Sequence, residues 1–514
     1  MDTTSSSYDA LPYGHCAFPQ THPDRLAVLG RLYGLSPAPP DRCRVLELGC
    51  ALGGNLLPMA ACLPGSRFVG IDLSEGQIER GQAVVEQLGL ENIELRAQDL
   101  MDFDDPGPFD YILCHGVYSW VPQPVRERIW SICKNGLAAG GLATISYNVY
   151  PGWHVKEAVR DILRHGARGG GEPGERVARA LEFLAFVARN VFKPDSPYGR
   201  TVRDAAETLV AADPIYVFHE YLEDFNRPER FEEFVAGAAS AGLRYVADAS
   251  LSDPSNRLTD EARQFLTGAS DDLVRCEQTL DFLRRGTFRR AVLCHDGLPV
   301  ERWPRPAALR DMLLVALAEC VSPEPASPDA VEQFRNAAGH TLSTSDAGLK
   351  TALRLLARAR PRGVSYAELL ADVRASRGEL DEARWAQLLL ACGTTSLVAL
   401  HVHLPAIASR PGDCPRAGAV ARWQAAAGQI VVNLRHECLE LDGLSRAVLS
   451  MLDGRRGRQD VCDELARRLG RGELTVADEA GQARSPAPSD WPGIVEGVLD
   501  ALAGLSLLLA GGEG

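Results

Sequence analysis

Short apolar segments alternate with helical patterns between Leu26 and Tyr147, as a doubly wound α/β sheet requires. The pattern predicts five parallel strands with helices between them. Their sequences are RVLELG (44–49), RFVGID (67–72), IELRAQD (93–99), FDYILCHG (109–116) and GLATISYN (141–148).

The hydrophobic pattern changes to a helical period after Trp153. Amphipathic runs follow at 155–163, 176–191 and 231–241, with interruptions at 169–171 and 194–197. Two further strand-like segments, GLRYVADA and FRRAVLCH, come next, and the second ends at His295. Five parallel strands followed by a late strand pair fit a seven-stranded methyltransferase sheet better than a six-stranded dinucleotide-binding sheet. The helical stretch is then an insertion before strand six, expected over the cofactor crevice.

The segment WPRP (303–306) is typical of a linker, and the chain beyond it is mainly helical. TSLVALHV, near residue 400, follows three predicted helices and resembles the wing of a winged-helix module. The predicted division is a cofactor lid (1–25), a cofactor-binding core (26–153), a helical insertion that completes the sheet (154–300), a winged-helix-like module (307–410) and a second C-terminal helical module (411–514).

Composition narrows the classes of partner. A net charge of −14 argues against nucleic acid as a bulk electrostatic partner. The polar opening MDTTSSSYDA and the absence of a long apolar run predict a cytoplasmic protein without membrane insertion. Thirteen cysteines without paired Cys/His spacing indicate free thiols and no metal site. The sequence leaves the oligomeric state open, with a homodimer among the arrangements it allows.

A glycine-rich turn follows the first strand, in ELGCALGGN. Gly49, Gly53 and Gly54 let the backbone approach a ligand closely, and the helix from Asn55 points its first N–H groups at an anionic group. Asp72, at the end of the next strand, can hold a ribose diol. These residues fit two cofactors, because Ala51 is the one departure from a dinucleotide fingerprint.

Later strand ends favour S-adenosylmethionine. Gln98-Asp99-Leu100 stands where an acid can accept from the adenine amino group. The fourth strand ends at Cys114 to Gly116, with Tyr118 and Trp120 just beyond it, at the edge where open α/β sheets bind ligands. Aromatic rings attract a sulfonium through their negative faces. A nicotinamide enzyme remains the alternative, with Tyr147 or His115 as proton donor.

Several uncommon motifs, in order, resemble a known family. They are PYGHCAFPQTHPDRLA, ELGCALGGN, FDYILCHGVYSWVP, SYNVYPGWHVKEAVRD, HEYLEDFNRPERFEEFV and QTLDFLRRGTFRRAVLCH, with ARWQAAAGQIVVNLRHE fainter. Together they resemble class I bacterial methyltransferases that carry a methyltransferase regulatory domain, a group that includes the outer-membrane-protein lysine methyltransferases. The likeness covers about residues 8 to 296 and is specific for the family but not for the substrate.

The resemblance implies a role for each matched residue. The methionine end of the cofactor is assigned to Glu47, Gly49 and Asn55, the ribose to Asp72, and the adenine to Gln98 and Asp99. The floor under the sulfonium is assigned to His115, Gly116 and Tyr118, and the lid to Tyr13, Phe18, Gln20, Thr21 and His22. Their neighbours Cys50, Ala51, Gly53, Leu73 and Leu100 complete the predicted cofactor site.

Methyl transfer needs a donor and an acceptor held in line, with water kept out. An amine acceptor needs no dedicated base once desolvation lowers its pKa. SYNVYPGW follows strand five, where an acceptor would approach. The candidates for acceptor binding and catalysis are therefore Tyr118, Tyr147, Asn148 and Trp153, with His154 as a proton acceptor. The expected acceptor is a protein or peptide lysine; the alternatives are a small metabolite or natural-product peptide, or a cofactor-sensing protein without catalysis.

Overall fold

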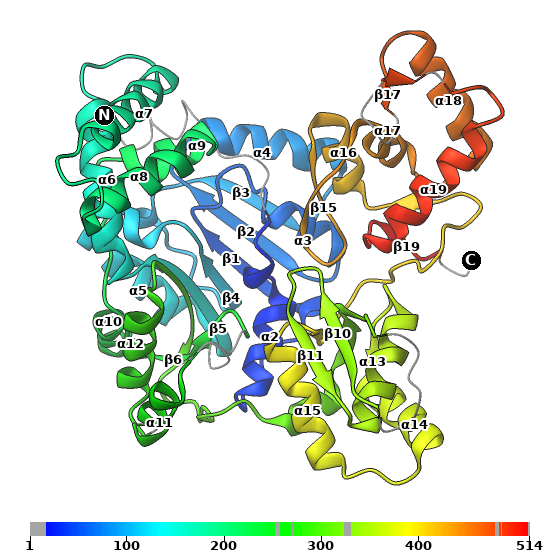
Figure 1. Ribbon diagram of the computed structural model, residues 1–514, viewed down its shortest axis with the longest axis horizontal. Coiled ribbons are helices and arrows are strands. Elements are labelled where there is room, and N and C mark those ends of the chain that lie inside the picture. Colours follow the sequence, from blue (N-terminus) through cyan, green and yellow to red (C-terminus); the bar gives the residue numbers. More distant parts are fainter. Residues whose placement is uncertain are drawn as a thin grey trace.

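The central element of the computed structural model is a seven-stranded sheet, around which the other parts of the chain form four lobes (Figure 1). The structure describes residues 17–251, 258–269, 271–322, 330–477, 483–484 and 486–511. The strand order is β3-β2-β1-β4-β5-β7-β6. The strands are β1 (Arg44–Leu48), β2 (Arg67–Asp72), β3 (Ile93–Ala97), β4 (Phe109–Cys114), β5 (Leu137–Asn148), β6 (Leu243–Asp248) and β7 (Phe288–His295).

The first five strands are parallel, and β7 runs antiparallel to both of its neighbours. The predicted seven-stranded methyltransferase sheet is therefore confirmed. Alternate side chains of β1 enter opposite faces of the sheet: Val45 packs in one core and Leu46 in the other. Helices cover both faces of the sheet. One face carries α2 (Pro23–Leu32), α3 (Leu56–Cys62) and α4 (Glu75–Leu88). The other face carries α5 (Gln123–Gly136) and α10 (Phe231–Ser240).

The helical insertion leaves the sheet directly after β5. Its helices form a lobe with its own core, which includes Leu163, Leu184 and Val202. They are α6 (Gly152–Gly166), α7 (Pro173–Asn190), α8 (Pro197–Val210) and α9 (Pro214–Val217). The predicted amphipathic runs do not include α8, which begins at the last residue of the predicted interruption at 194–197. Pro197 instead begins that helix, and the Ser196 hydroxyl caps it by accepting from the Gly199 N–H at 3.0 Å. Before β7 come α11 (Asp260–Gly268) and α12 (Leu273–Arg284).

The segment after the linker has a larger share of strand than its helical pattern predicted. β8, in the apolar run LLVA, pairs with β13 from far along the chain, and this tertiary pairing decides between helix and strand. The elements are β8 (Leu313–Ala316), β9 (Ala318–Cys320), β10 (Glu332–Asn336), β11 (Thr341–Thr344), α13 (Ala347–Ala359), β12 (Val364–Ser365), α14 (Tyr366–Arg377), α15 (Glu382–Thr394) and β13 (Val398–His401).

The last segment surrounds another buried cluster, which includes Val448, Leu465 and Leu499. Its elements are β14 (Arg416–Ala417), α16 (Ala419–Ala427), β15 (Ile430–Val432), β16 (Cys438–Glu440), α17 (Gly443–Met451), α18 (Arg458–Gly470), β17 (Val476–Ala477), β18 (Ala483–Arg484), α19 (Trp491–Gly504) and β19 (Leu508–Leu509). The two C-terminal segments lie on the side of the sheet away from the insertion (Figure 1). The proposed domain boundaries stay predictions. In the described part of the chain, no helix is long and apolar enough to cross a membrane.

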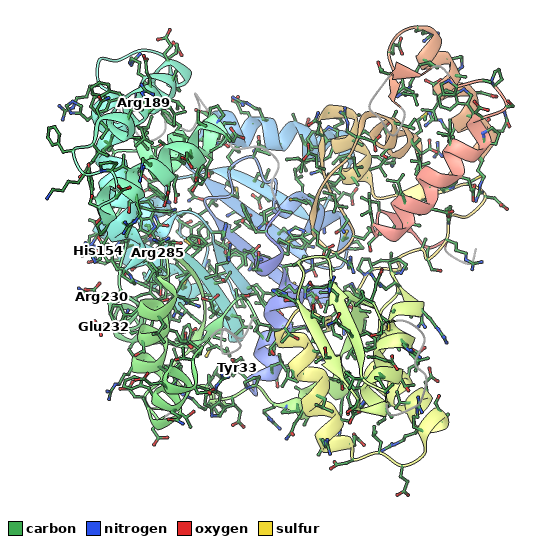
Figure 2. All side chains as sticks on the ribbon, viewed as in Figure 1. Tyr33, His154, Arg189, Arg230, Glu232 and Arg285 are labelled. Carbon is green, nitrogen blue, oxygen red and sulfur yellow. The ribbon has the colours of Figure 1, made fainter. Side chains whose placement is uncertain are left out.

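Helix α2 joins the sheet to the segment after the linker. Val28 and Leu32 pack in the core of that segment, and Tyr33, at the end of α2, packs against both cores (Figure 2). The buried carboxylate of Asp24 accepts from the Val402 N–H at 2.7 Å, the His403 N–H at 2.8 Å and the His401 Nδ1 at 2.7 Å. Burial by itself would raise the pKa of Asp24, but His401, followed by His22 and Arg25, lowers it, and together they hold the pKa at about 2.

We predict that Asp24→Ala destabilises the contact between α2 and the segment after the linker. Three donors, of which the His401 ring is buried, lose their acceptor, and an unsatisfied buried group costs about 1–3 kcal/mol. We expect urea unfolding to shift to lower concentration and the Val402 and His403 amides to exchange faster with solvent. The ionised carboxylate contributes stability above pH 4 that is lost as pH falls toward 2, and this acid dependence should weaken in the variant. Asp413→Ala, at an exposed carboxylate, is the control, and equal behaviour of both variants would contradict the prediction.

Candidate functional site

The turn after β1 has three residues in the left-handed region of backbone space. Gly49 has a φ of +75°, Ala51 of +50° and Gly53 of +79°. A Cβ on Gly49 would lie 2.3 Å from a methyl carbon of Val117, so only glycine fits there. The Gly49 and Cys50 N–H groups both donate to the Ile71 carbonyl, at 2.8 and 3.1 Å. The turn is therefore held against the end of β2.

Asp72 fixes the same turn from the neighbouring strand. Its Oδ2 accepts from the Ala51 N–H at 2.8 Å, and its Oδ1 accepts from the Ser74 N–H at 2.9 Å. In the sequence, Ala51 is the one departure from a dinucleotide fingerprint. The structure adds that its left-handed conformation aims the N–H at Asp72, which positions a carboxylate at the carboxyl end of β2.

Apolar and polar groups lie side by side at the ends of β2 and β3. Leu73 is 44% exposed and Met101 is 46% exposed, although both are apolar. Asp99 Oδ1 accepts from the Met101 N–H at 2.9 Å, and Gln98 Nε2 donates to the Asp102 carbonyl at 3.1 Å. Leu100 packs partly buried against the core below. Exposed apolar side chains beside an acid suit a flat heterocycle such as adenine. Met101 was not among the predicted site residues.

Glu47, in β1 just before the turn, is a buried carboxylic acid that is 3% exposed. Its Oε1 accepts from Asn55 Nδ2 at 2.8 Å, whereas no described residue donates to its buried Oε2. Burial raises the pKa of Glu47 to about 7. A carboxyl group with one unpartnered oxygen, poised to ionise near neutral pH, fits a cationic group such as an α-ammonium.

The segment before α2 lies over this acid. Phe18 donates its N–H to Asn55 Oδ1 at 3.0 Å, and Thr21 Oγ1 accepts from Asn55 Nδ2 at 3.0 Å. The Phe18 ring lies 4.0 Å from the His115 ring between centroids. Gln20 belongs to the same short turn, η1 (Pro19–Thr21), and Tyr13 lies outside the described residues.

His115 and Gly116 directly follow β4, at the floor of the site. The Gly116 N–H donates to Ser146 Oγ at 2.8 Å, and a Cβ on Gly116 would meet nothing within 4 Å. Burial, with a smaller contribution from Arg290, lowers the pKa of His115 to about 3. His115 is therefore uncharged at neutral pH and does not repel a cation.

Tyr118 belongs to a buried aromatic cluster with Trp130, Tyr147 and Phe234. Tyr147 stacks on Phe234 with a centroid distance of 3.9 Å. The Tyr118 hydroxyl donates to Glu229 Oε2 at 3.4 Å. Glu229 in turn pairs with the buried Arg126 at 2.6 Å. Glu229 was not among the predicted site residues; it lies between α9 and α10, and the fold brings it to the floor.

The other acceptor candidates lie in different surroundings. Asn148 is buried at the end of β5 and donates from Nδ2 to Asn226 Oδ1 at 3.0 Å. Trp153 is fully buried against Trp120. His154 lies in the first turn of α6, with a side chain that is 57% exposed, and its ring stacks on Tyr150 at the edge of the molecule (Figure 2). The catalytic roles of all five candidates stay predictions.

A residue from the last segment also reaches the site. His436, between β15 and β16, has its Nε2 2.9 Å from Asn55 Oδ1, and its ring lies 5.0 Å from that of His22. The two partners are 381 positions apart in the sequence. His436 lies in the fainter motif ARWQAAAGQIVVNLRHE, but nothing in that motif indicates a contact with Asn55.

Three family models match the chain. They are "Methyltransferase domain" at 45–141, "Predicted methyltransferase regulatory domain" at 213–295 and "PKMT, C-terminal winged helix domain" at 413–504. The uncharacterized protein RP789 of Rickettsia prowazekii is 30% identical over 491 residues, covering 92% of this chain and 88% of that protein. The chain belongs to the class I methyltransferases with a methyltransferase regulatory domain.

A solved structure supports the cofactor assignment. PKMT2 from Rickettsia typhi, solved in complex with AdoHcy, is 26% identical, with a TM-score of 0.85 over 97% of this chain and 100% of that one. A protein-L-isoaspartate O-methyltransferase from Roseiflexus sp. is 34% identical over 136 residues, covering 26% of this chain and 59% of that one. The protein is thus an S-adenosylmethionine-dependent methyltransferase, and the nicotinamide alternative is discarded.

The cofactor supplies a methyl group on a positively charged sulfur. The described residues that suit it are the Glu47 carboxyl for its ammonium, Asp72 for its ribose diol, and Leu73 and Asp99 for its adenine. The neutral His115 and the lid residue Phe18, whose rings are in contact, would exclude water from its sulfur end. These individual roles are proposals that rest on the geometry above.

We predict that cofactor affinity depends on the ionisation of Glu47. An α-ammonium stabilises the carboxylate, so the affinity for S-adenosylhomocysteine should rise about tenfold as pH increases from 6 to 8, through the pKa of about 7. Isothermal titration in buffers of different ionisation enthalpy should detect a proton released on binding below pH 7.

In Glu47→Gln, binding at pH 8 should weaken about tenfold, and the pH dependence between 6 and 8 should disappear. Glu94→Gln, at an exposed carboxylate of the same domain, is the control. A Glu47→Gln profile parallel to that of the unmodified protein would contradict the assignment.

Proposed function

We propose that the methyltransferase modifies lysine side chains of a protein or peptide. The supporting observation is the whole-length likeness to PKMT2, since PKMT denotes a protein lysine methyltransferase, together with the match of the PKMT winged-helix model to 413–504. The net charge of −14 also favours encounter with a lysine-rich substrate.

We infer that this acceptor binds at the end of β5. Asn148 donates a hydrogen bond from Nδ2 to Asn226 Oδ1, and no described residue donates to the Oδ1 of Asn148. We infer that this oxygen accepts a hydrogen bond from the lysine Nζ. The buried aromatic cluster of Tyr118, Tyr147 and Phe234 packs next to this strand end, and we infer that apolar surroundings there lower the pKa of the amine and expose its lone pair.

The test is transfer of a labelled methyl group. We expect the purified protein, with methyl-labelled S-adenosylmethionine, to label an unfolded bacterial outer-membrane protein, and mass spectrometry to place the methyl groups on lysine. Acetylation of the substrate lysines should abolish labelling, and the label should resist mild alkali.

Three results would contradict the lysine assignment. Alkali-labile label would indicate a carboxyl methyl ester. Label from a cell extract found only in the small-molecule fraction would indicate a metabolite acceptor. No transfer to any substrate, with intact cofactor binding, would indicate a sensor.

We also propose that the protein forms a homodimer. Large apolar side chains are exposed on the insertion lobe: Phe186 is 53% exposed and Val210 is 73% exposed, and Phe192, between α7 and α8, is fully exposed. Light scattering coupled to gel filtration should give twice the mass of the chain, and Phe192→Asp should shift it toward the monomer. A monomeric mass for the unmodified protein at micromolar concentration would contradict the proposal.

A further inference from the structure

The Asn55 amide has a single orientation. Its Oδ1 must face the Phe18 backbone N–H, which can only donate. The Thr21 hydroxyl donates to the Phe18 carbonyl at 2.8 Å and therefore accepts from Asn55 Nδ2. His436 Nε2 meets Asn55 Oδ1 at 2.9 Å and must then be the donor. With the bond to Glu47, all four hydrogen-bonding positions of the amide are filled.

His436 is built for this contact. It is 4% exposed, and its φ of +63° places a non-glycine residue in the left-handed region, which costs free energy. Burial, followed by the neighbouring His22, lowers the pKa of His436 well below its ordinary value, so the ring is neutral. A neutral imidazole carries a single N–H group. In His436 that group is at Nε2 and donates its hydrogen bond to Asn55 Oδ1.

The turn that carries His436 is held by its own segment. Asn433 Oδ1 accepts from the Arg435 and Glu437 N–H groups, both at 2.9 Å. Asn433 Nδ2 donates to the Leu505 carbonyl at 3.0 Å, and the Leu434 N–H donates to the Ser506 carbonyl at 3.0 Å. The end of α19 thus sets the position of the imidazole.

The last segment also contacts the core independently of His436. Val420 on α16 packs in the core cluster beside α3, and Trp423 packs against it. The Ala17 N–H donates to Cys438 Sγ at 3.3 Å. Because these contacts remain when the imidazole is removed, the docked arrangement does not depend on the His436 hydrogen bond.

We propose that His436, from the C-terminal winged-helix segment, is a positioning residue of the cofactor site that acts through Asn55. Its donated hydrogen bond holds the amide so that Nδ2 points at Glu47 and Thr21. The C-terminal segment thereby completes the methionine end of a site formed otherwise by the core and the lid. The proposal concerns cofactor binding and does not rest on the lysine acceptor.

Three full-length variants test this role. His436→Ala removes the donor, His436→Gln restores an N–H at a similar reach, and Ile430→Ala changes an exposed side chain of the same hairpin. Titration with S-adenosylhomocysteine at pH 8 should show about tenfold weaker binding for His436→Ala, recovery to within about threefold for His436→Gln, and no change for Ile430→Ala. In turnover assays with the donor varied, KM should rise and kcat should stay the same.

The pH profile of binding separates positioning from a general structural effect. The hydrogen bond from Asn55 lowers the pKa of Glu47, against burial and the nearby Asp72, which raise it. An amide released in His436→Ala should therefore move the inflection of the profile to higher pH. Unchanged affinity in His436→Ala would overturn the proposal. A loss of affinity that His436→Gln does not rescue, with an unmoved inflection and a lowered melting temperature, would overturn it as well.

Discussion

The buried amide of Asn55 is the point on which the arrangement of the cofactor site depends. Withdrawing such a group from water is costly unless each of its donors and acceptors finds a partner. Its partners come from β1, from the segment before α2 and from the turn that carries His436. The amide can be satisfied only when all three are in place, so assembly of distant parts of the chain and formation of the methionine end are one event.

Burial also sets the charge of the site. It lowers the pKa of His22 to about 4 and that of His115 to about 3, and it also lowers the pKa of His436 well below its ordinary value. All three rings are neutral near pH 7. Glu47 has the opposite shift, and burial leaves its pKa at about 7. A site of neutral rings with one acid ready to ionise attracts a cation without a resident positive charge to repel it.

Local sequence patterns predicted the features that are determined by residues close together in the chain. The strands of the sheet, the glycine turn and the acid at Asp72 are set by short stretches of sequence, and the sheet is confirmed. β8 was missed because its apolar run is decided by pairing with β13, and α8 because Pro197 begins a helix as readily as it interrupts one. His436 could not be found locally, since its partner is 381 residues away.

The C-terminal segment and the regulatory segment contribute residues to different parts of the site. The donor side is completed by His436 of the C-terminal segment, whereas the floor receives Glu229 and Phe288 from the stretch matched by the regulatory-domain model. Glu229 fixes Arg126 and the Tyr118 hydroxyl, and its N–H donates to the Asn148 carbonyl at 3.0 Å. The regulatory segment is therefore bonded to the residues proposed to receive the acceptor and not to the Asn55 network. Changes in that segment can therefore alter the acceptor side and the floor at Tyr118 and His115 while the hydrogen bonds of Asn55 stay the same.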